Sequence, residues 1–458
     1  MLILNQGVNF LEVMEATKIV QRVVAMACML YLLLSLRFLF SGQSNKRKRI
    51  RDVELPYHCK RKRILWEPLV RNLGDDEFKR HHRISRALFD KIHKKIERHI
   101  KTDAKYVRKS CCRGNVSHID SRSRLSMLLK HLAGSKTQDI YHAHGVSRPS
   151  VVQAIATTMD AIIQEFPIKP FPFDDETTLQ TLTDGFRSKS TGGLFENVVG
   201  AFDGYLLRIC KRCIGKTSDV QDPNKYYCRK GFYAVNCQVS CDSNRKVTSL
   251  SMLCPGAVPD TLAHKKRLYM HRALVEGKLP ERFMFIGDNA YPESDQMLTP
   301  CTRTQMKHDI HGYMDNYNFY LSQLRINIEC TFGMIVNKFP ILQATLMTSK
   351  LSSACKTFMV CCILHNLCID ERLEMTDTQP RSFNAKERYT QRAVETTRVL
   401  VEDEDFEYVE GMDEVTTQEL LDRSANVGVT DEIDLTGLSA KERMIAIIAS
   451  KGYVRPKY

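Results

Sequence analysis

Apolar and polar residues follow different periods in different parts of the chain, and these changes divide it into four regions. An apolar stretch near the N-terminus is followed by helical spacing, then by short apolar runs typical of strands, and finally by a polar, locally acidic stretch. The predicted regions are an N-terminal extension (1–63), an all-helical region (64–175), a mixed α/β domain (190–373) and a largely disordered tail with a short C-terminal helix (374–458).

The all-helical region holds one long periodic pattern and three further segments. Acidic residues from Asp75 to Glu77 favour a helix start, and apolar residues then recur at helical spacing from Phe78 to Ile96. The further helices are predicted at Ser121–Leu132, Thr137–His144 and Arg148–Phe166.

The last two of these helices match a helix-turn-helix. A short helix is followed by a turn containing Gly145 and by a longer helix that Ser147 can cap, with Pro149 in its first turn. This order is typical of a DNA-binding motif. Packing of three helices without any DNA is the alternative interpretation.

The α/β domain is predicted from four strand-like runs and the helical segments between and after them. The runs are 198–209, 231–240, 246–253 and 283–286, and the helices are 261–274, 321–336 and 354–373. Three strands, a helix, a strand and then helices indicate a mixed sheet flanked by helices.

Three acidic residues stand where such a domain places catalytic groups. Asp203 and Asp288 each follow a short apolar run, and Glu329 adjoins the apolar stripe of a predicted helix. Three carboxylates that converge need cations, and Mg²⁺ (or Mn²⁺) suits oxygen ligands. Two such ions catalyse in-line phosphoryl transfer. The alternative is three unrelated turn or surface carboxylates.

Charge suggests a polyanionic partner such as DNA. The 458-residue chain carries a net charge of +14, with the basic excess concentrated in the first third. The residues predicted to contact DNA are Lys46, Arg47, Lys48, Arg49, Lys60, Arg61, Lys62, Arg63 and Arg148. The two clusters are typical of nuclear import signals or phosphate-binding patches, and a solvated basic linker is the alternative.

The apolar stretch 23–40 is at the short limit for a helix that spans a membrane. A membrane anchor, a partner-binding or core helix, and an upstream extension foreign to the working protein are the alternatives, and the anchor is the least favoured. The sixteen cysteines are irregularly spaced in a long chain, which favours reduced intracellular thiols over a disulfide scaffold.

Zinc is a weaker candidate. Cys210-x2-Cys213 and Cys237-x3-Cys241 invite a zinc site, but four residues of a strand span about 13 Å, too far for one tetrahedral ion. His308 and His311 follow a loop and lack a clear third ligand.

Several motifs, taken in order, resemble the Harbinger-type (PIF/Harbinger) DDE transposases over about residues 75–370. The motifs are Ala201-Phe202-Asp203-Gly204, Lys230-Gly231-Phe232-Tyr233-Ala234-Val235-Asn236, Pro255-Gly256 with Asp260, Gly287-Asp288-Asn289-Ala290-Tyr291-Pro292, Asn318, Arg325-x3-Glu329-x2-Phe332-Gly333 and His365-Asn366. The resemblance implies an RNase H-like nuclease fold in which Asp203, Asp288 and Glu329 form the metal-binding triad. It also implies a separate Myb-like DNA-binding partner.

Three positions depart from the family pattern, which has Thr, His and Arg where this chain has Tyr205, Pro259 and Cys330. None of them removes a triad carboxylate. Accessory roles are open for Asp260, Asn318 and Arg325, with a salt bridge to Glu329 as the simplest role for Arg325.

The sequence therefore predicts a nuclear, metal-dependent DNA endonuclease or transposase, for which assembly as a homo-oligomer is an open expectation. The alternative is a transposase-derived DNA-binding or scaffold protein that no longer cuts.

Overall fold

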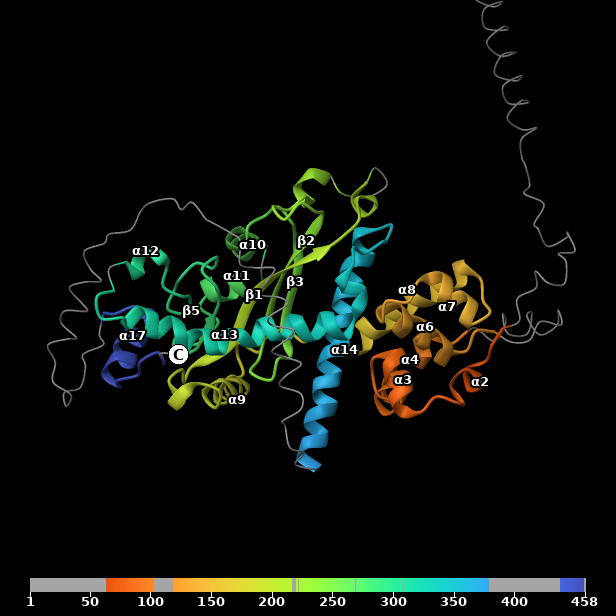
Figure 1. Cartoon of the computed structure of the whole chain (residues 1–458), viewed down its shortest axis with the longest axis horizontal. Coiled ribbons are helices and arrows are strands. Elements are labelled where there is room, and N and C mark those ends of the chain that lie inside the picture. Colours follow the sequence, from red (N-terminus) through yellow and green to blue (C-terminus); the bar gives the residue numbers. More distant parts are fainter. Residues whose placement is uncertain are drawn as a thin grey trace, which may run out of the picture. The chain divides into compact units, whose positions relative to one another are not determined.

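The computed structural model describes residues 63–102, 118–215, 220, 222–267, 269–307, 309–378 and 437–456 (Figure 1). The chain divides into two units, Met1–Arg61 and Lys62–Tyr458, and all described residues belong to the second. The apolar stretch 23–40, the basic residues from Lys46 to Lys62, His308 and most of the predicted disordered tail therefore lie outside the described residues.

A five-stranded mixed sheet forms the centre of the α/β domain. Its strands are β1 (Val198–Arg208), β2 (Ala234–Cys241), β3 (Val247–Pro255), β4 (Met284–Ile286) and β5 (Met297–Leu298). The spatial order is β3-β2-β1-β4-β5, in which β2 runs antiparallel to β1 and β3, whereas β4 runs parallel to β1 and β5. This is the RNase H-like arrangement, and the predicted fold class is confirmed.

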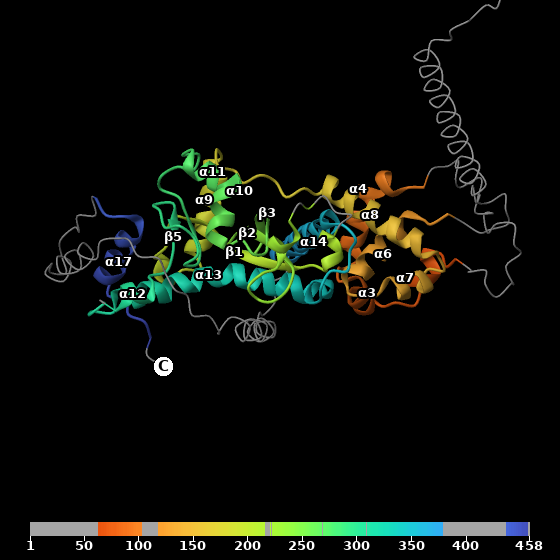
Figure 2. The same ribbon diagram turned by 90° about the horizontal axis from the view of Figure 1, so that it is seen from above.

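Helices cover both faces of this sheet (Figure 2). They are α9 (Glu176–Arg187), α10 (Asp260–Arg267), α11 (Tyr269–Val275), α13 (Tyr313–Lys338) and α14 (Leu351–Thr378). The short helix α12 (Arg303–Met306) precedes α13 in the chain. Short 3₁₀ turns lie at Thr191–Gly193, Lys211–Ile214, Pro223–Tyr226 and Pro340–Gln343. Aromatic residues of β1 and β4, including Phe202 and Phe285, pack with α9 and α11 in a second, smaller apolar core.

α13 carries the predicted apolar stripe into the main core. Leu324, Ile328 and Phe332 are all buried, as their four-residue spacing predicts. The helix packs against β1, β2 and β4 and is longer at both ends than the sequence indicated.

α14 closes the domain through two adjacent polar residues. His365 Nε2 lies 2.7 Å from the carbonyl oxygen of Arg245, and the Asn366 amide bonds both the N–H and the C=O of Val247 at 2.8 Å. The motif His365-Asn366 therefore holds the turn between β2 and β3. This helix is long and apolar enough to cross a membrane. However, 61% of its most apolar 18-residue stretch is buried inside the protein, as in a core helix.

The helical region contains α2 (Trp66–Val70), α3 (Asp75–His82), α4 (Arg86–Ile100), α6 (Ser121–Leu132), α7 (Thr137–Ala143) and α8 (Arg148–Glu165). The three segments after residue 120 match their predicted bounds closely, and Ser147 caps α8 as expected. The long pattern before them is two helices, because Arg83 adopts a left-handed conformation (φ 63°) and Ser85 caps a new start.

The C-terminal helix is α17 (Ala440–Ser450), which a capping box of Ser439 and Glu442 begins. It packs against α13 through Met444, Ile445 and Ile448. The features that were not predicted are α2, α9, β5, α12, and the division of the predicted helix 261–274 into α10 and α11.

Candidate active site

Two of the predicted carboxylates occupy equivalent places on neighbouring parallel strands. Ala201 of β1 pairs with Ile286 of β4, so Asp203 and Asp288 each lie two residues beyond a paired position. Adjacent strands are about 4.8 Å apart and side chains alternate with a period of two. The register therefore brings Asp203 and Asp288 together on one face, at the point where β4 ends.

Glu329 approaches from the helix that covers the same face. Asp203 shares its face of β1 with Tyr205, whose ring lies 5.3 Å from the ring of Phe332 on α13. Glu329 lies one turn before Phe332 on that helix and is half-buried. The sheet and α13 thus place the third carboxylate opposite the first two.

The electrostatics of the site follow from this convergence. Burial, followed by the negative charge of Asp288, raises the pKa of Asp203 to about 8. Burial also raises the pKa of Asp288, and the carboxylates of Asp260 and Glu329 act in the same direction. Both aspartates are therefore costly to ionise together without a nearby cation.

Arg325 partly supplies that cation. Its guanidinium nitrogen lies 2.6 Å from a carboxylate oxygen of Glu329, one helical turn away, as the simplest prediction for this residue had it. The same guanidinium lowers the pKa of both Asp203 and Asp288. Arg325 thus acts as an internal counter-ion to all three carboxylates.

Asp260 adjoins the triad through Gly204. The structure places the Asp260 carboxylate so close to Gly204 that a Cβ at this position would overlap Asp260 Oδ1. Glycine after Asp203 is therefore required for α10 to bring its first residue against β1. The sequence left the role of Asp260 open, and the geometry places it beside the triad.

A buried polar network holds Asp260 in this position. Asn236 and Gln238 of β2 donate to its Oδ1 at 2.8 and 2.7 Å, and the Tyr291 hydroxyl donates to Gln238 Oε1 at 2.7 Å. Sequence reasoning assigned no site role to these three residues. The available signal was the alternation of polar residues along β2, where Asn236, Gln238 and Ser240 are all buried.

The turn after β4 orients Asp288 by local hydrogen bonds. Asp288 Oδ1 accepts from the backbone N–H of Ala290 at 3.0 Å. The hydroxyl of Thr261, on α10, donates to the carbonyl oxygen of Ala290. The turn is thereby tied to the helix that carries Asp260.

The donor chemistry of this cluster suits a hard divalent cation, because carboxylate oxygens are the ligands that Mg²⁺ and Mn²⁺ prefer. In the described part of the chain, no group of three or more His, Cys, Asp or Glu side chains is already arranged to hold a metal. Glu329 is turned towards Arg325 instead. An ion bound by the full triad would have to replace Arg325 as the partner of Glu329.

Asn318 lies apart from this cluster. Its amide accepts from the backbone N–H of Cys301 at 2.7 Å and donates to the carbonyl oxygen of the same residue at 3.0 Å. Eleven residues of α-helix, about 16 Å, separate it from Glu329. The structure thus places Asn318 as a tie between α13 and the segment after β5.

The structure shows the surroundings of the three residues that depart from the family pattern. Tyr205 fills space between two helices, with its ring stacked 5.0 Å from Phe358 of α14 and close to Phe332. Cys330 is buried on α13, directly after Glu329. The backbone carbonyl of Pro259 accepts hydrogen bonds within the first turn of α10, and nothing explains the choice of proline.

The cysteines considered for zinc do not gather at one point. Cys210 and Cys213 have sulfur atoms 3.4 Å apart beside Thr348, whereas Cys237 and Cys241 are buried in β2. Arg148, at the start of α8, is exposed to solvent.

Comparison with known proteins agrees with this geometry. Residues 202–366, which include all three triad residues, match the family described as DDE superfamily endonuclease. The "Putative nuclease HARBI1" of Mus musculus is 22% identical over 259 residues, which cover 55% of this chain and 68% of the mouse protein. The chain carries a Harbinger-type DDE domain.

Two other relatives of the DDE domain extend the comparison. The same nuclease of Bos taurus is 22% identical over 254 residues, covering 55% of this chain and 68% of its own length. That of Homo sapiens is 22% identical over 272 residues, covering 57% and 73%. No solved structure gave a significant match. The family predicted from the motifs is confirmed, and the domain is related to nucleases derived from transposases.

Proposed function

We propose that the protein is a metal-dependent DNA endonuclease or transposase that cleaves phosphodiesters by a two-metal in-line mechanism. The observation that carries the proposal is the position of Asp203 and Asp288, each two residues beyond the paired residues Ala201 of β1 and Ile286 of β4. These two acids share one face, and their pKa values are raised because they are buried together. Such a pair is typical of a site built for cations.

Each residue has a definite task in this proposal. Asp203 and Asp288 would hold the cations, and Glu329 would complete the ligand set if it no longer paired with Arg325. The divalent ions, Mg²⁺ or Mn²⁺, supply activation of the attacking oxygen and stabilisation of the leaving oxygen. Arg325 would then be available to pair with a DNA phosphate. Asp260 and its network fix the edge of the site.

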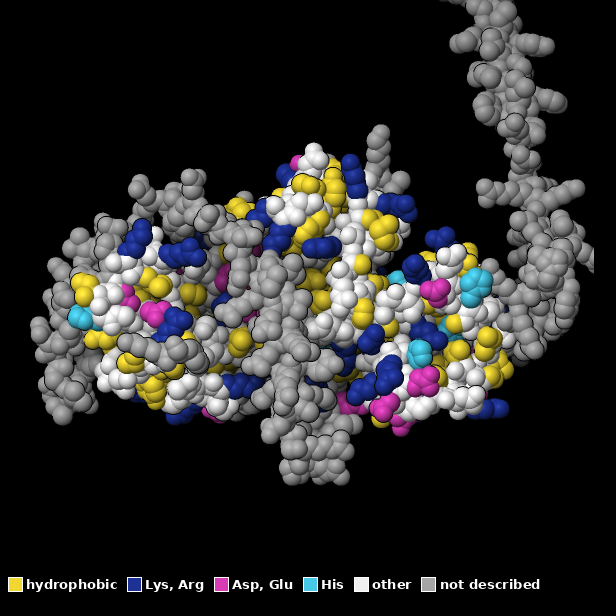
Figure 3. All heavy atoms as spheres, viewed as in Figure 1, with side chains coloured by type: hydrophobic (Ala, Val, Ile, Leu, Met, Phe, Trp, Pro, Cys, Tyr) yellow, Lys and Arg dark blue, Asp and Glu magenta, His cyan; other side chains and the backbone are white. Residues whose placement is uncertain are grey.

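The DNA substrate is supported by charge and by the helical region. The chain has a net charge of +14, and Lys and Arg side chains are spread over both the sheet domain and the helical region on the face seen in Figure 3. The two basic clusters and Arg148 supply sequence-independent affinity in this proposal, and α7 and α8 form the helix-turn-helix. Action in the nucleus, a Myb-like partner and a homo-oligomer belong to the same proposal.

Nicking of supercoiled plasmid tests the mechanism. Purified full-length protein should nick in Mg²⁺ or Mn²⁺ and not in EDTA. Asp288→Ala and Asp203→Asn should each lower the rate by at least about a thousandfold. The reason is that the cations that stabilise the charge of the transition state lose a ligand. The matched control is Asp184→Asn, an exposed acid of α9 in the same domain, which should nick as the parent does. Equal nicking by Asp288→Ala would refute the triad.

A second candidate function is a DNA-binding or scaffold protein that no longer cuts. The observation that favours it is the ion pair of Glu329 with Arg325, which leaves the triad without a ready-made metal site in the part of the chain that is described. This protein would bind DNA with the same salt dependence and show no nicking in either metal.

A further inference from the structure

The C-terminal segment 437–456 contacts the supports of all three triad carboxylates. It reaches the segment that follows Asp288, the helix that carries Glu329, and the turn that precedes the strand of Asp203. The family match ends at residue 366, so this segment lies outside it.

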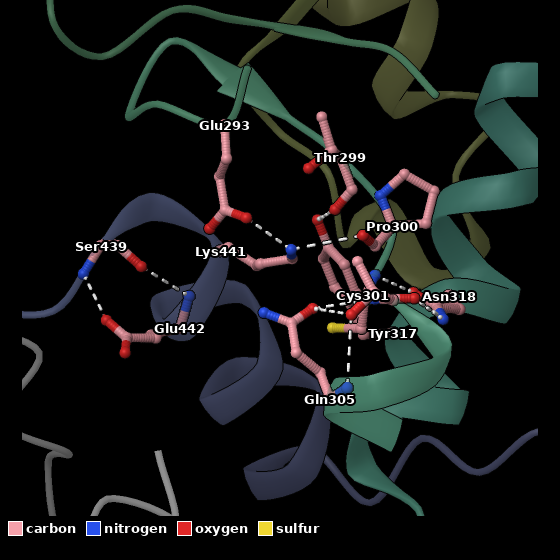
Figure 4. A network of polar contacts seen from close by, with 11 residues as sticks. Glu293, Thr299, Pro300, Cys301, Gln305, Tyr317, Asn318, Ser439, Lys441 and Glu442 are labelled. Atoms are coloured by element: carbon pink, nitrogen blue, oxygen red, sulfur yellow. Dashed lines mark hydrogen bonds and ion pairs between the residues drawn. The ribbon is translucent and has the colours of Figure 1, made fainter. Parts of the chain in front are cut away.

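The first contact joins α17 to the segment that leaves Asp288. Lys441 Nζ lies 2.6 Å from Glu293 Oε2, five residues after Asp288, and 3.3 Å from the carbonyl oxygen of Pro300 (Figure 4). The backbone N–H of Ala440 donates to Asp295 Oδ1 at 2.8 Å. The start of α17 thus contacts the middle of the segment between Asp288 and Cys301, at Glu293 and Asp295, and its far end, at Pro300.

Lys441 is an unusual residue for an ordinary helix contact. Only 6% of its side chain is exposed. A lysine buried to this degree is stable only if its charge is paired, so the ion pair with Glu293 selects one position of α17 on the domain. Displacing the helix by one residue would leave the ammonium group buried without its partner.

The same segment is held from the other side by α13. The Tyr317 hydroxyl donates to the carbonyl oxygen of Thr299 at 3.1 Å, and Asn318 binds Cys301 through both groups of its amide (Figure 4). The end of the segment, from Thr299 to Cys301, therefore lies between α13 and α17. Without α17, this part of the segment would keep only its contacts with α13.

The rest of the C-terminal segment reaches the other two supports. The Tyr320 hydroxyl of α13 donates to the carbonyl oxygen of Val454 at 2.9 Å, and Arg455 forms an ion pair with Asp315 at 2.9 Å. Tyr453 packs so closely on Gly192, in the turn six residues before β1, that a Cβ there would overlap its hydroxyl.

We propose that residues 437–456 form an in-chain clamp that fixes the segment 288–301, and that Lys441 is a positioning residue for Asp288. The inference rests on the proposed metal site. In this proposal, the geometry of that site also depends on residues 437–456, which lie outside the DDE motifs. Without the clamp, the segment would keep its bonds to α10, β2 and β4, but its part from Glu293 to Pro300 would lose the contacts of α17, and the placement of Asp288 beside Asp203 would loosen.

The test uses the full-length chain with three substitutions. Lys441→Met removes the charge and keeps the packing of the stem, and Lys441→Arg keeps the charge. Lys451→Met removes a lysine from the exposed end of the same helix and is the matched control. Hydrogen exchange of peptides covering 288–301 reports the clamp, and electron paramagnetic resonance of Mn²⁺ reports the site.

Lys441→Met should speed exchange in 288–301 and weaken Mn²⁺ binding on the order of tenfold, the usual effect of losing a group that orients a metal ligand. Exchange in β1 and β2 should stay unchanged. Lys441→Arg should restore most of both properties, and Lys451→Met should match the parent. If Lys441→Met does not fold, Glu293→Gln, which leaves Lys441 bonded to Pro300, is read out in the same way.

Unchanged exchange in 288–301 together with unchanged Mn²⁺ affinity would overturn the clamp. Failure of the proposed function is a separate result: the parent would then bind no Mn²⁺, or Asp288→Ala would bind it equally well. Exchange in 288–301 still reports the clamp in that case.

Discussion

At the scale of single residues, the site is a compromise between carboxylates that repel each other and the groups that keep them in place. Arg325 offsets part of the repulsion, and Asn236 and Gln238 fix Asp260. The pKa of Asp203 is nevertheless raised, first by its burial and then by the negative charge of Asp288. Both a bound cation and a bound proton relieve the repulsion between the carboxylates. The free energy of unfolding should therefore depend on divalent ions and on pH.

Stability of the metal-free protein should depend on pH through Asp203. Its pKa is about 8 in the folded chain and about 3.9 when unfolded. The stability that its proton provides is fully present below the unfolded pKa and is lost as pH rises to the folded pKa. Asp203→Asn should therefore reduce the fall in Tm between about pH 5 and about pH 8 in EDTA.

Thermal melts of the parent and Asp203→Asn at both pH values measure this difference. Saturating Mn²⁺ should raise the Tm of the parent more at the higher pH and leave that of the variant almost unchanged. A parallel pH dependence in the two proteins would contradict the pKa of Asp203. Asp184→Asn serves again as the control.

At the scale of elements, the pattern of apolar residues predicted helix boundaries that the local sequence determines. It missed features that depend on contacts between distant residues. The helices after residue 120 were predicted almost to the residue, since Gly145, Ser147 and Pro149 mark their ends. The long pattern from Phe78 was divided incorrectly, because apolar spacing continues across the left-handed turn at Arg83. β5 is two residues long and exists through its pairing with β4, which no local pattern reveals.

The same distinction applies to the site. Asp203, Asp288 and Glu329 could be singled out because each adjoins an apolar run or stripe. The bonds of Asn318 to Cys301 and of Lys441 to Glu293 join residues 17 and 148 positions apart, and nothing in the local sequence indicates them. The side-chain direction of Glu329, towards Arg325, was predicted only as one of several roles for that arginine.

The cap that divides α3 from α4 should contribute measurably to stability. Ser85 Oγ accepts from the backbone N–H of Leu88 at 3.0 Å and also bonds Glu371 of α14. Ser85→Ala should lower the free energy of unfolding by about 0.5–2 kcal/mol. Urea denaturation measures the change, with Ser322→Ala, at an exposed position inside α13, as the control. An equal effect in both variants would contradict the role of the cap.

At the scale of the whole molecule, the basic charge and the acidic site have complementary effects on DNA. The net charge of +14 attracts the polyanion over a long range, whereas the carboxylates repel phosphate until cations neutralise them. Binding and cutting should therefore be separable, since the first depends on salt and the second on divalent ions.

Affinity for DNA should fall steeply with salt, and the first basic cluster should account for part of the slope. Replacing Lys46, Arg47, Lys48 and Arg49 by alanine should reduce the slope of log affinity against log salt by about 0.9 for each phosphate that the variant no longer neutralises. Fluorescence anisotropy with a labelled duplex measures it. The control is Arg272→Ala with Lys278→Ala, because both side chains are already paired with Glu276. An unchanged slope in the cluster variant would exclude its binding to phosphate.

The position of α17 also bears on how the integrity of such a gene is judged. A stop codon between codons 379 and 436 would leave every residue of the DDE match and every triad carboxylate in the reading frame. The product would nevertheless lack Lys441, Tyr453 and Arg455, and with them one wall of the segment that follows Asp288. Copies of this gene should therefore be called intact only when the codons for residues 437–456 are read as well.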